Sequence, residues 1–147
     1  MSVASDKGTP IQLKFVTEIN DQRQKQTVAF QANGQYYIKG NSTYLQFIEP
    51  NDLGDVKTIV KIKESEVLIL RSGAVTMRQL FRKSETTNGT YQSPAGNMEM
   101  LTNTNNVEYK FYNKSHKGHL FLTYTLVLQG EPTGRYTITI TFKEEKE

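Results

Sequence analysis

Apolar side chains alternate with polar ones along most of this chain, which is the spacing of a β-strand that buries one face. The longest alternating stretches cover residues 56–63, 120–128 and 136–142. Shorter ones cover 11–16, 26–30, 36–38, 45–47, 75–81, 98–101 and 107–111, and the continuous apolar run at 67–70 fits a buried strand. No segment has the i, i+3, i+4, i+7 spacing of a long amphipathic helix. The pattern therefore predicts an all-β protein with about ten strands.

The connections between these strands are short and rich in turn-forming residues. Gly-Asn stands at 40–41, Pro-Asn-Asp-Leu-Gly at 50–54 and Ser-Gly at 72–73. A parallel crossover needs about a dozen residues, so successive strands are expected to be antiparallel. A long series of antiparallel strands leaves exposed edges unless the sheet closes or doubles. We therefore expect a single antiparallel up-and-down β-barrel, with a two-sheet sandwich as the alternative.

The length and the chain ends agree with one barrel domain. The chain has 147 residues, of which 36% are hydrophobic and 22% charged. We expect a flexible N-terminal segment over 1–9, the barrel over 10–142 and a charged, solvated tail over 143–147. Residues 1–9 lack the apolar core of a secretory signal. No run reaches the ~18 apolar residues of a membrane helix. We therefore expect a cytoplasmic protein with no membrane partner.

Several kinds of chemistry are excluded or disfavoured by the residue types present. The absence of cysteine excludes disulfides, thiolate nucleophiles and sulfur-ligated metals. His116 and His119 lie in an expected turn, with no nearby carboxylate to complete a metal site. Neither a Gly-x-Ser-x-Gly motif nor a phosphate-binding glycine-rich loop occurs. We expect no metal, no cofactor and no catalytic residue, and an enzyme acting within the barrel is only a third hypothesis.

The direction of Arg71 and Arg78 depends on the register of the hairpin that contains them. With a two-residue turn at 72–73, both arginines lie on the outer face together with Val67 and Ile69. A one-residue slip would bring Arg78 to the core face. We prefer the first register because it avoids burying a guanidinium without a partner. It gives the core face to Leu68, Leu70, Val75 and Met77.

The same register predicts an outer face that is both basic and apolar. If residues 64–66 form a three-residue loop, Lys57, Lys61 and Lys63 join the two arginines there. Such a face is either a surface for a protein partner or a solvated face protected by its lysines. Nucleic acid is not expected as a partner, because single-strand binders interleave aromatic residues with basic ones. Here aromatic residues lie on other expected strands, at Tyr36, Tyr37, Tyr44 and Phe47.

Two segments carry a family resemblance. Residues 44–81 read YLQFIEPNDLGDVKTIVKIKESEVLILRSGAVTMRQLF, and residues 90–104 read TYQSPAGNMEMLTNT. Together they resemble the uncharacterised YwiB-like β-barrel family of bacteria, which has a calycin-like, lipocalin-type fold. The resemblance covers most of the chain, from about residue 9 to residue 142. It implies this fold but no activity, since the family has none established. The early Gly-x-Trp motif of true lipocalins is absent, because the chain contains no tryptophan.

Barrels of this size either fill with side chains or hold one small ligand. The leading hypothesis is a non-catalytic protein that binds a small, partly apolar molecule in the barrel. The alternative is a protein–protein interaction module, or a homodimer, that uses the outer face with Val67, Ile69, Arg71 and Arg78. Residues 90–96 are expected to form a turn in which Tyr91 closes the barrel mouth. The predicted ligand-binding residues are Arg71, Arg78, Met77, Tyr91, Met98, Tyr109 and Tyr124, with Phe30 and Leu70 as further lining.

Overall fold

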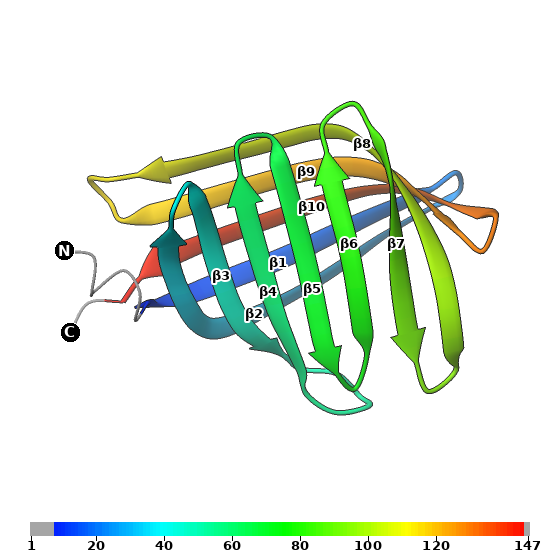
Figure 1. Cartoon of the computed structure of the whole chain (residues 1–147), viewed down its shortest axis with the longest axis horizontal. Coiled ribbons are helices and arrows are strands. Elements are labelled where there is room, and N and C mark those ends of the chain that lie inside the picture. The colour runs from blue at the N-terminus through cyan, green and yellow to red at the C-terminus, as the bar shows by residue number, and fades with distance from the viewer. Residues whose placement is uncertain (1–7, 146–147) are drawn as a thin grey trace.

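The computed structural model describes residues 8–145, which form ten antiparallel strands closed into one barrel (Figure 1). Each strand pairs with the next along the chain, and the first pairs with the last. This confirms the all-β, up-and-down barrel. The described residues contain no helix that could cross a membrane. The strands are β1 (Thr9–Asp21), β2 (Gln24–Lys39), β3 (Ser42–Glu49), β4 (Val56–Lys63), β5 (Glu66–Gly73), β6 (Thr76–Arg82), β7 (Thr86–Ser93), β8 (Gly96–Tyr112), β9 (Lys117–Leu128) and β10 (Glu131–Glu144).

The barrel is flattened into two layers whose strands cross. Strands β3 to β7 form one layer, and β1, β9 and β10 run across it in the other (Figure 1). The two long strands β2 and β8 belong to both layers, because each changes its partner along its length. At the bend of β2, a Cβ on Gly34 would lie 2.4 Å from the backbone oxygen of Gln46. Glycine therefore permits the close approach of β2 and β3 at this corner.

Apolar side chains fill the middle of the barrel. Every strand sends alternate residues inward, and the inward positions are buried on most strands. Leu45, Ile69, Leu120 and Ile140 are fully buried, each from a different strand. Burying a side chain of this size stabilises the fold by about 1.5–3 kcal/mol. The continuous core is therefore the main source of stability.

The register of the β5–β6 hairpin differs from both registers considered from the sequence. Arg71 pairs with Met77, so the turn lies beyond residues 72–73. Ser72 and Gly73 continue β5 alongside β4 instead of forming the turn. Gly73 has a φ of 122°, and a Cβ there would lie 2.5 Å from the backbone oxygen of Asp55. The expected turn at 72–73 was wrong, because this glycine serves the contact with β4.

The predicted faces of β5 were also reversed. Val67 and Ile69 are fully buried, whereas Leu70 is 36% exposed on the outer side. Arg71 lies two positions after Ile69 on β5, so its side chain points inward as that of Ile69 does, whereas Arg78 is exposed. Four successive apolar residues contain no alternation, so the sequence could not distinguish their two faces. The penalty for burying Arg71 is offset by a carboxylate partner from another strand, described below.

Three smaller expectations also need correction. Residues 90–96 are not a single turn, because β7 and β8 together include all of them except residues 94–95. The turn after β4 has two residues, so Lys63 pairs with Glu66, and Lys57, Lys61 and Lys63 face outward with Leu68 and Leu70. The barrel begins at Thr9 and continues to Glu144, beyond the expected limits at both ends. Residues 1–7 of the expected N-terminal segment and 146–147 of the tail lie outside the described part of the chain.

Candidate functional site

Four of the predicted ligand-binding residues come together at one level of the barrel interior. Arg71 pairs with Met77, Met77 with Tyr91 and Tyr91 with Met98, on strands β5, β6, β7 and β8. Directly paired residues in an antiparallel sheet project from the same face. On β4 the partner of Arg71 is Thr58. We call this level the Arg71 end, and it consists of Glu49, Thr58, Arg71, Met77, Tyr91 and Met98.

Glu49 holds the Arg71 side chain in place. The Arg71 Nε donates a hydrogen bond to the Glu49 carboxylate at 2.6 Å. The Thr58 hydroxyl donates to the same carboxylate oxygen. One terminal nitrogen of Arg71 lies 3.1 Å from the Met77 sulfur, and the guanidinium carbon lies 5.8 Å from the centre of the Phe15 ring. The ion pair is largely buried, with 18% of the Arg71 side chain and 15% of the Glu49 side chain exposed.

The guanidinium retains hydrogen-bonding capacity toward solvent. Arginine has five N–H donors, and a thioether sulfur is a weak acceptor. Within residues 8–145, the only hydrogen-bond acceptors of Arg71 are Glu49 and Met77. The exposed part of the side chain shows that solvent reaches it. Arg71 is therefore a cation held in place by Glu49, and its terminal nitrogens can still donate hydrogen bonds to an anionic partner.

Three phenylalanines form an apolar wall beside this cation. The ring of Phe15 lies 5.2 Å from that of Phe30 and 6.1 Å from that of Phe47, measured between centroids. Phe30, a predicted lining residue, is half-buried. It lies in the part of β2 that pairs with β1 only, since β3 pairs with residues 34–39. The barrel wall is therefore interrupted beside Phe30.

Tyr124 lies deeper in the interior, between aromatic and polar neighbours. Its ring packs 4.9 Å from that of Phe81 and 5.1 Å from that of Tyr136. Burial raises the pKa of Tyr124, and the effects of Arg71 and the Gln79 amide oppose this increase only in part. The buried Gln79 amide donates a hydrogen bond to the Thr102 hydroxyl at 3.0 Å. The Tyr124 phenol is therefore neutral, and it lies close enough to Arg71 for the positive charge of Arg71 to affect its pKa.

Tyr109 lies elsewhere in the barrel, with an aromatic cluster that we call the Tyr36 end: Tyr36, Tyr109, Phe111 and Phe142. The Tyr36 ring lies 5.4 Å from that of Phe111 and 5.2 Å from that of Phe142. The Tyr109 hydroxyl is buried and makes no hydrogen bond of ordinary geometry among the described residues. Burial, assisted by Tyr36, raises its pKa, while the Thr43 hydroxyl lowers it slightly. Arg78 and Leu70 pair with each other on the outer surface, so neither they nor Tyr109 reach the Arg71 end.

Sequence reasoning missed Glu49, Thr58 and Gln79. Glu49 follows Leu45 and Phe47 at a spacing of two, which places it on the inward face of β3. This spacing could have indicated that Glu49 points inward. A carboxylate just before a Pro-Asn-Asp loop, however, is usually exposed to solvent. Gln79 follows Val75 and Met77 at a spacing of two, so the core face predicted for this strand already pointed to an inward Gln79. The pairing of Glu49 with Arg71, 22 positions later, could not be read from local pattern.

Surface hollows occur apart from this site. Three of them have volumes of about 950, 500 and 350 Å³, and none is lined by Arg71, Met77 or Tyr91. Core side chains fill the middle of the barrel. A ligand at the Arg71 end must therefore insert among the half-buried side chains Phe30, Tyr91 and Met98.

Comparisons with known proteins agree with this fold. The family described as a domain of unknown function, DUF1934, matches residues 13–140. The chain is 36% identical over 135 residues to the uncharacterized beta-barrel protein YwiB of Bacillus subtilis (strain 168), covering 92% of this chain and 94% of that protein. The crystal structure of the ywiB protein from Bacillus subtilis matches with a TM-score of 0.85 and 35% identity, covering 95% of this chain and 94% of that one. The expected resemblance to YwiB-like barrels is confirmed, and this chain belongs to the DUF1934 family.

Proposed function

We propose that this protein binds a small, partly apolar carboxylate at the Arg71 end of its barrel. It does so as a non-catalytic, calycin-like binding protein of the cytoplasm. The observation that carries the proposal is the inward side chain of Arg71, which is bonded to Glu49 and is 18% exposed to solvent. A charged group inside a barrel wall is costly unless it is paired. Barrels of this size commonly hold one ligand in the mouth.

The surroundings of Arg71 suit an amphipathic carboxylate. Its carboxylate would accept hydrogen bonds from the terminal nitrogens of Arg71, the geometry in which guanidinium binds carboxylates most strongly. Its apolar part would contact Phe30, Tyr91 and Met98, which are half-buried. The thioether chain of Met98 can adapt to different apolar shapes. Glu49 would keep its bond to Nε and so hold the guanidinium in one orientation.

Native mass spectrometry of freshly purified protein, compared with the denatured mass, is the first test. A non-covalent excess of a few hundred daltons, typical of one small ligand, would support binding. Its extraction would identify the chemical class.

Arg78 provides a matched control for the role of Arg71, because it has the same charge but lies on the outer surface. A panel of aliphatic and aromatic carboxylic acids would be screened by thermal shift. We expect stabilisation of the wild type and of Arg78→Gln, and at least a tenfold weaker affinity in Arg71→Gln. This corresponds to about 1.4 kcal/mol, within the range of a charged hydrogen bond. Equal binding by both variants would refute the proposal, as would a bare native mass together with no stabilisation by the panel.

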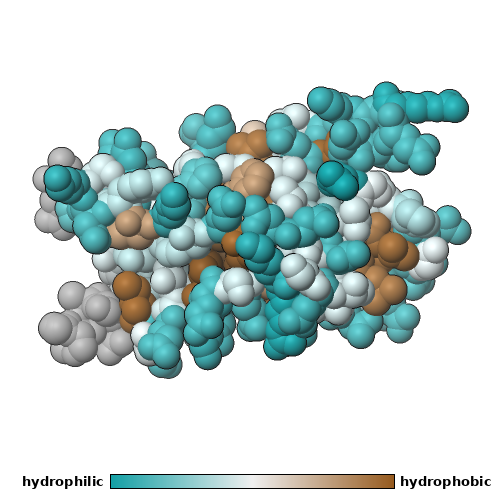
Figure 2. Space-filling view, turned by 90° about the horizontal axis from the view of Figure 1, so that it is seen from above, coloured by the Kyte–Doolittle hydropathy of each residue, from teal (hydrophilic) through white to brown (hydrophobic). Residues whose placement is uncertain are grey.

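A second candidate function is a protein-interaction surface on the outer side of β3 to β6. Ile48 is 49% exposed and Leu70 36% exposed, near the outward Lys57 and Arg78. The mixture favours a partner with acidic and apolar groups. Like charge opposes a homodimer formed by two copies of this face. Most of the surface seen in Figure 2 is hydrophilic, with small separate hydrophobic areas.

The test of this surface must change a residue that lies outside the core. Ile69 is fully buried, so Ile69→Asp would unfold the protein whatever its function. Leu70→Asp is the appropriate change, and it should abolish partner capture while leaving the melting temperature nearly unchanged. Retention of the captured partner by Leu70→Asp would exclude this face.

A further inference from the structure

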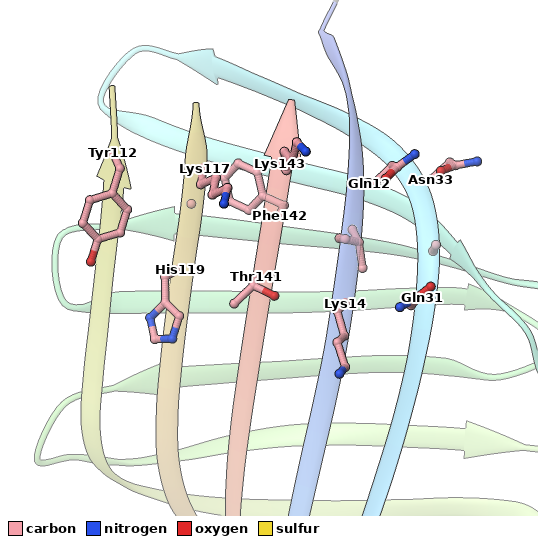
Figure 3. A pocket seen from close by; sticks show the side chains of 13 residues that line it. Gln12, Lys14, Gln31, Asn33, Tyr112, Lys117, His119, Thr141, Phe142 and Lys143 are labelled. Carbon is pink, nitrogen blue, oxygen red and sulfur yellow. The ribbon is translucent and has the colours of Figure 1, made fainter. Parts of the chain in front are cut away.

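A second candidate site lies on the outer surface of the barrel, across β8, β9, β10, β1 and β2. It is the hollow of about 950 Å³, and its lining includes Lys14, Lys117, Lys143 and His119. Figure 3 shows the rings of Tyr112 and His119 on one side, lysines in the middle and the amides of Gln12, Gln31 and Asn33 on the other side. Among residues 8–145, no carboxylate lines the hollow. Its lining side chains are therefore rich in positive charge and hydrogen-bond donors.

The pairing of the strands brings like charges together at this place. Lys117 on β9 lies directly opposite Lys143 on β10. In the adjacent row, His119 lies opposite Lys110 on β8, and Lys14 follows beyond Thr141. Directly opposed like charges destabilise an antiparallel pair. The arrangement therefore costs stability in the isolated protein, which an anionic ligand would relieve.

No carboxylate of the described residues forms an ion pair with these lysines. The ion pairs in residues 8–145 are Arg71–Glu49, Arg82–Glu66 and His116–Glu144, and none includes a lysine of the hollow. Glu108 and Glu145 lie two positions along the strands from Lys110 and Lys143, outside the lining. The Glu108 carboxylate already accepts a hydrogen bond from Asn106. The positive potential of the hollow is therefore available to an external anion.

We propose that this hollow binds a linear inorganic polyphosphate. Lysine ammonium groups bind phosphate as compact charges without requiring one geometry. Five strands at their usual spacing span about 19 Å, enough room for several linked phosphates. Tyr112 is the one lining residue with a large exposed aromatic ring, at 51% exposure. A run of stacked bases would need further rings, so the phosphate chain is the better fit.

Calorimetric titration of the full chain with tripolyphosphate and with long-chain polyphosphate tests the proposal. We expect binding at about 50 mM salt that weakens at least tenfold at about 200 mM, because the contacts are between exposed charges. Lys117→Gln with Lys143→Gln should weaken binding at least tenfold. The matched control, Lys57→Gln with Lys63→Gln, removes the same charge from the outer side of β4 and should leave the affinity within about twofold, a difference of roughly 0.4 kcal/mol.

Stability measurements separate loss of binding from loss of structure. Removing the opposed lysine pair relieves repulsion, so the melting temperature of Lys117→Gln with Lys143→Gln should equal or exceed that of the wild type. Polyphosphate should raise the melting temperature of the wild type and of the control variant.

Four results would overturn the proposal. These are no binding at low salt, equal loss of affinity in the control variant, tighter binding of ATP than of tripolyphosphate, and tighter binding of a single-stranded oligonucleotide than of polyphosphate at equal phosphate concentration. The last two would show that a base contributes to recognition. In that case Tyr112→Ala should weaken the binding of the nucleotide or oligonucleotide. None of these outcomes depends on a ligand at the Arg71 end, which lies on the opposite side of the barrel wall.

Discussion

The Arg71 end and the Tyr36 end show two ways in which one barrel treats its interior. At the Tyr36 end, the buried rings of Tyr36 and Phe142, 9% and 2% exposed, pack against the half-buried ring of Phe111. At the Arg71 end, an ion pair lies beside half-buried Phe30, Tyr91 and Met98. On β3, Thr43 marks the Tyr36 end, because it affects the pKa of Tyr109, and Phe47 marks the Arg71 end, because it pairs with Thr58. The two residues are four positions apart, which corresponds to about 13 Å along the strand. The two ends are therefore distinct environments within the same sheet.

This difference suggests a division of roles. Aromatic clusters add to stability through the packing of their rings and offer no charged group to a ligand. A paired charge reached by solvent contributes less to stability but can recognise an anion. Changes at the Tyr36 end should therefore alter folding, and changes at the Arg71 end should alter binding.

The largest expected effect is from Phe142→Ala at the Tyr36 end. Phe142 packs against Tyr36 and Phe111, so its truncation should lower the free energy of unfolding by about 3–5 kcal/mol. Met98→Ala at the Arg71 end should cost less than half as much, because Met98 is only half-buried. Urea denaturation of both variants measures the difference. Equal costs would remove the proposed division between the two ends.

Alkaline pH should destabilise the protein through its buried tyrosines. The pKa values of Tyr36, Tyr109 and Tyr124 are all raised above 10.0, mainly by burial. Below pH 10 these phenols are protonated in both states, so they do not make stability depend on pH. Above pH 10 the unfolded tyrosines ionise first, so each lowers the free energy of unfolding by up to about 1.4 kcal/mol per pH unit.

Urea midpoints between pH 9 and pH 11 measure this slope. Tyr109→Phe should make the slope shallower, whereas Tyr112→Phe, at an exposed position, should leave it unchanged. A slope that is identical in the wild type and in Tyr109→Phe would contradict the conclusion that the raised pKa of Tyr109 destabilises the protein at alkaline pH.

Glu49→Gln should separate stability from binding at the Arg71 end. Loss of the carboxylate leaves the largely buried Arg71 without its ionic partner, so the free energy of unfolding should fall by about 1–2 kcal/mol. The same change removes a negative charge that competes with a carboxylate ligand. We therefore expect tighter binding of such a ligand, measured by titration. Weaker binding by a folded Glu49→Gln protein would mean that the orientation which Glu49 imposes on Arg71 matters more for binding than the removal of its negative charge.

The smallest expected effect is from Tyr109→Phe at neutral pH. The Tyr109 hydroxyl is buried without a hydrogen bond of ordinary geometry, so its removal should leave stability unchanged or raise it by up to about 1 kcal/mol. Tyr124→Phe provides the comparison, because the Tyr124 hydroxyl is not among the buried polar atoms of the described residues that lack a hydrogen-bond partner. That change should cost about 0.5–1.5 kcal/mol. A larger cost for Tyr109→Phe than for Tyr124→Phe would reveal a partner of the Tyr109 hydroxyl.

Much of the fold followed from local sequence pattern, and the failures occurred where that pattern was absent. Residues 56–63 alternate clearly and form β4 with the predicted core face. The run Val67 to Leu70 does not alternate, and its faces were assigned in reverse. Residues 90–93 contain Thr, Tyr, Gln and Ser before a proline, so a turn was expected where β7 runs to Ser93.

The candidate site was predicted in part. Met77, Tyr91 and Met98 form one inward row, because Met77 pairs directly with Tyr91 and Tyr91 pairs directly with Met98, and directly paired residues point to the same face. Arg71 was named but placed on the outer face, since its partner was unknown. Glu49 is 22 positions earlier in the sequence and reaches Arg71 only because β3, β4 and β5 lie side by side.

The sequence by itself determined the antiparallel order, the barrel and the strands other than β7, because side-chain alternation and short connections are local properties. Tertiary structure decided which face of β5 is buried, which charge enters the interior and which lysines meet across β9 and β10. These outcomes depend on the register between strands, and a register is set by the sum of contacts on both faces. An inward arginine is tolerated only where the fold brings a carboxylate to it, and that condition is absent from any single segment of the chain.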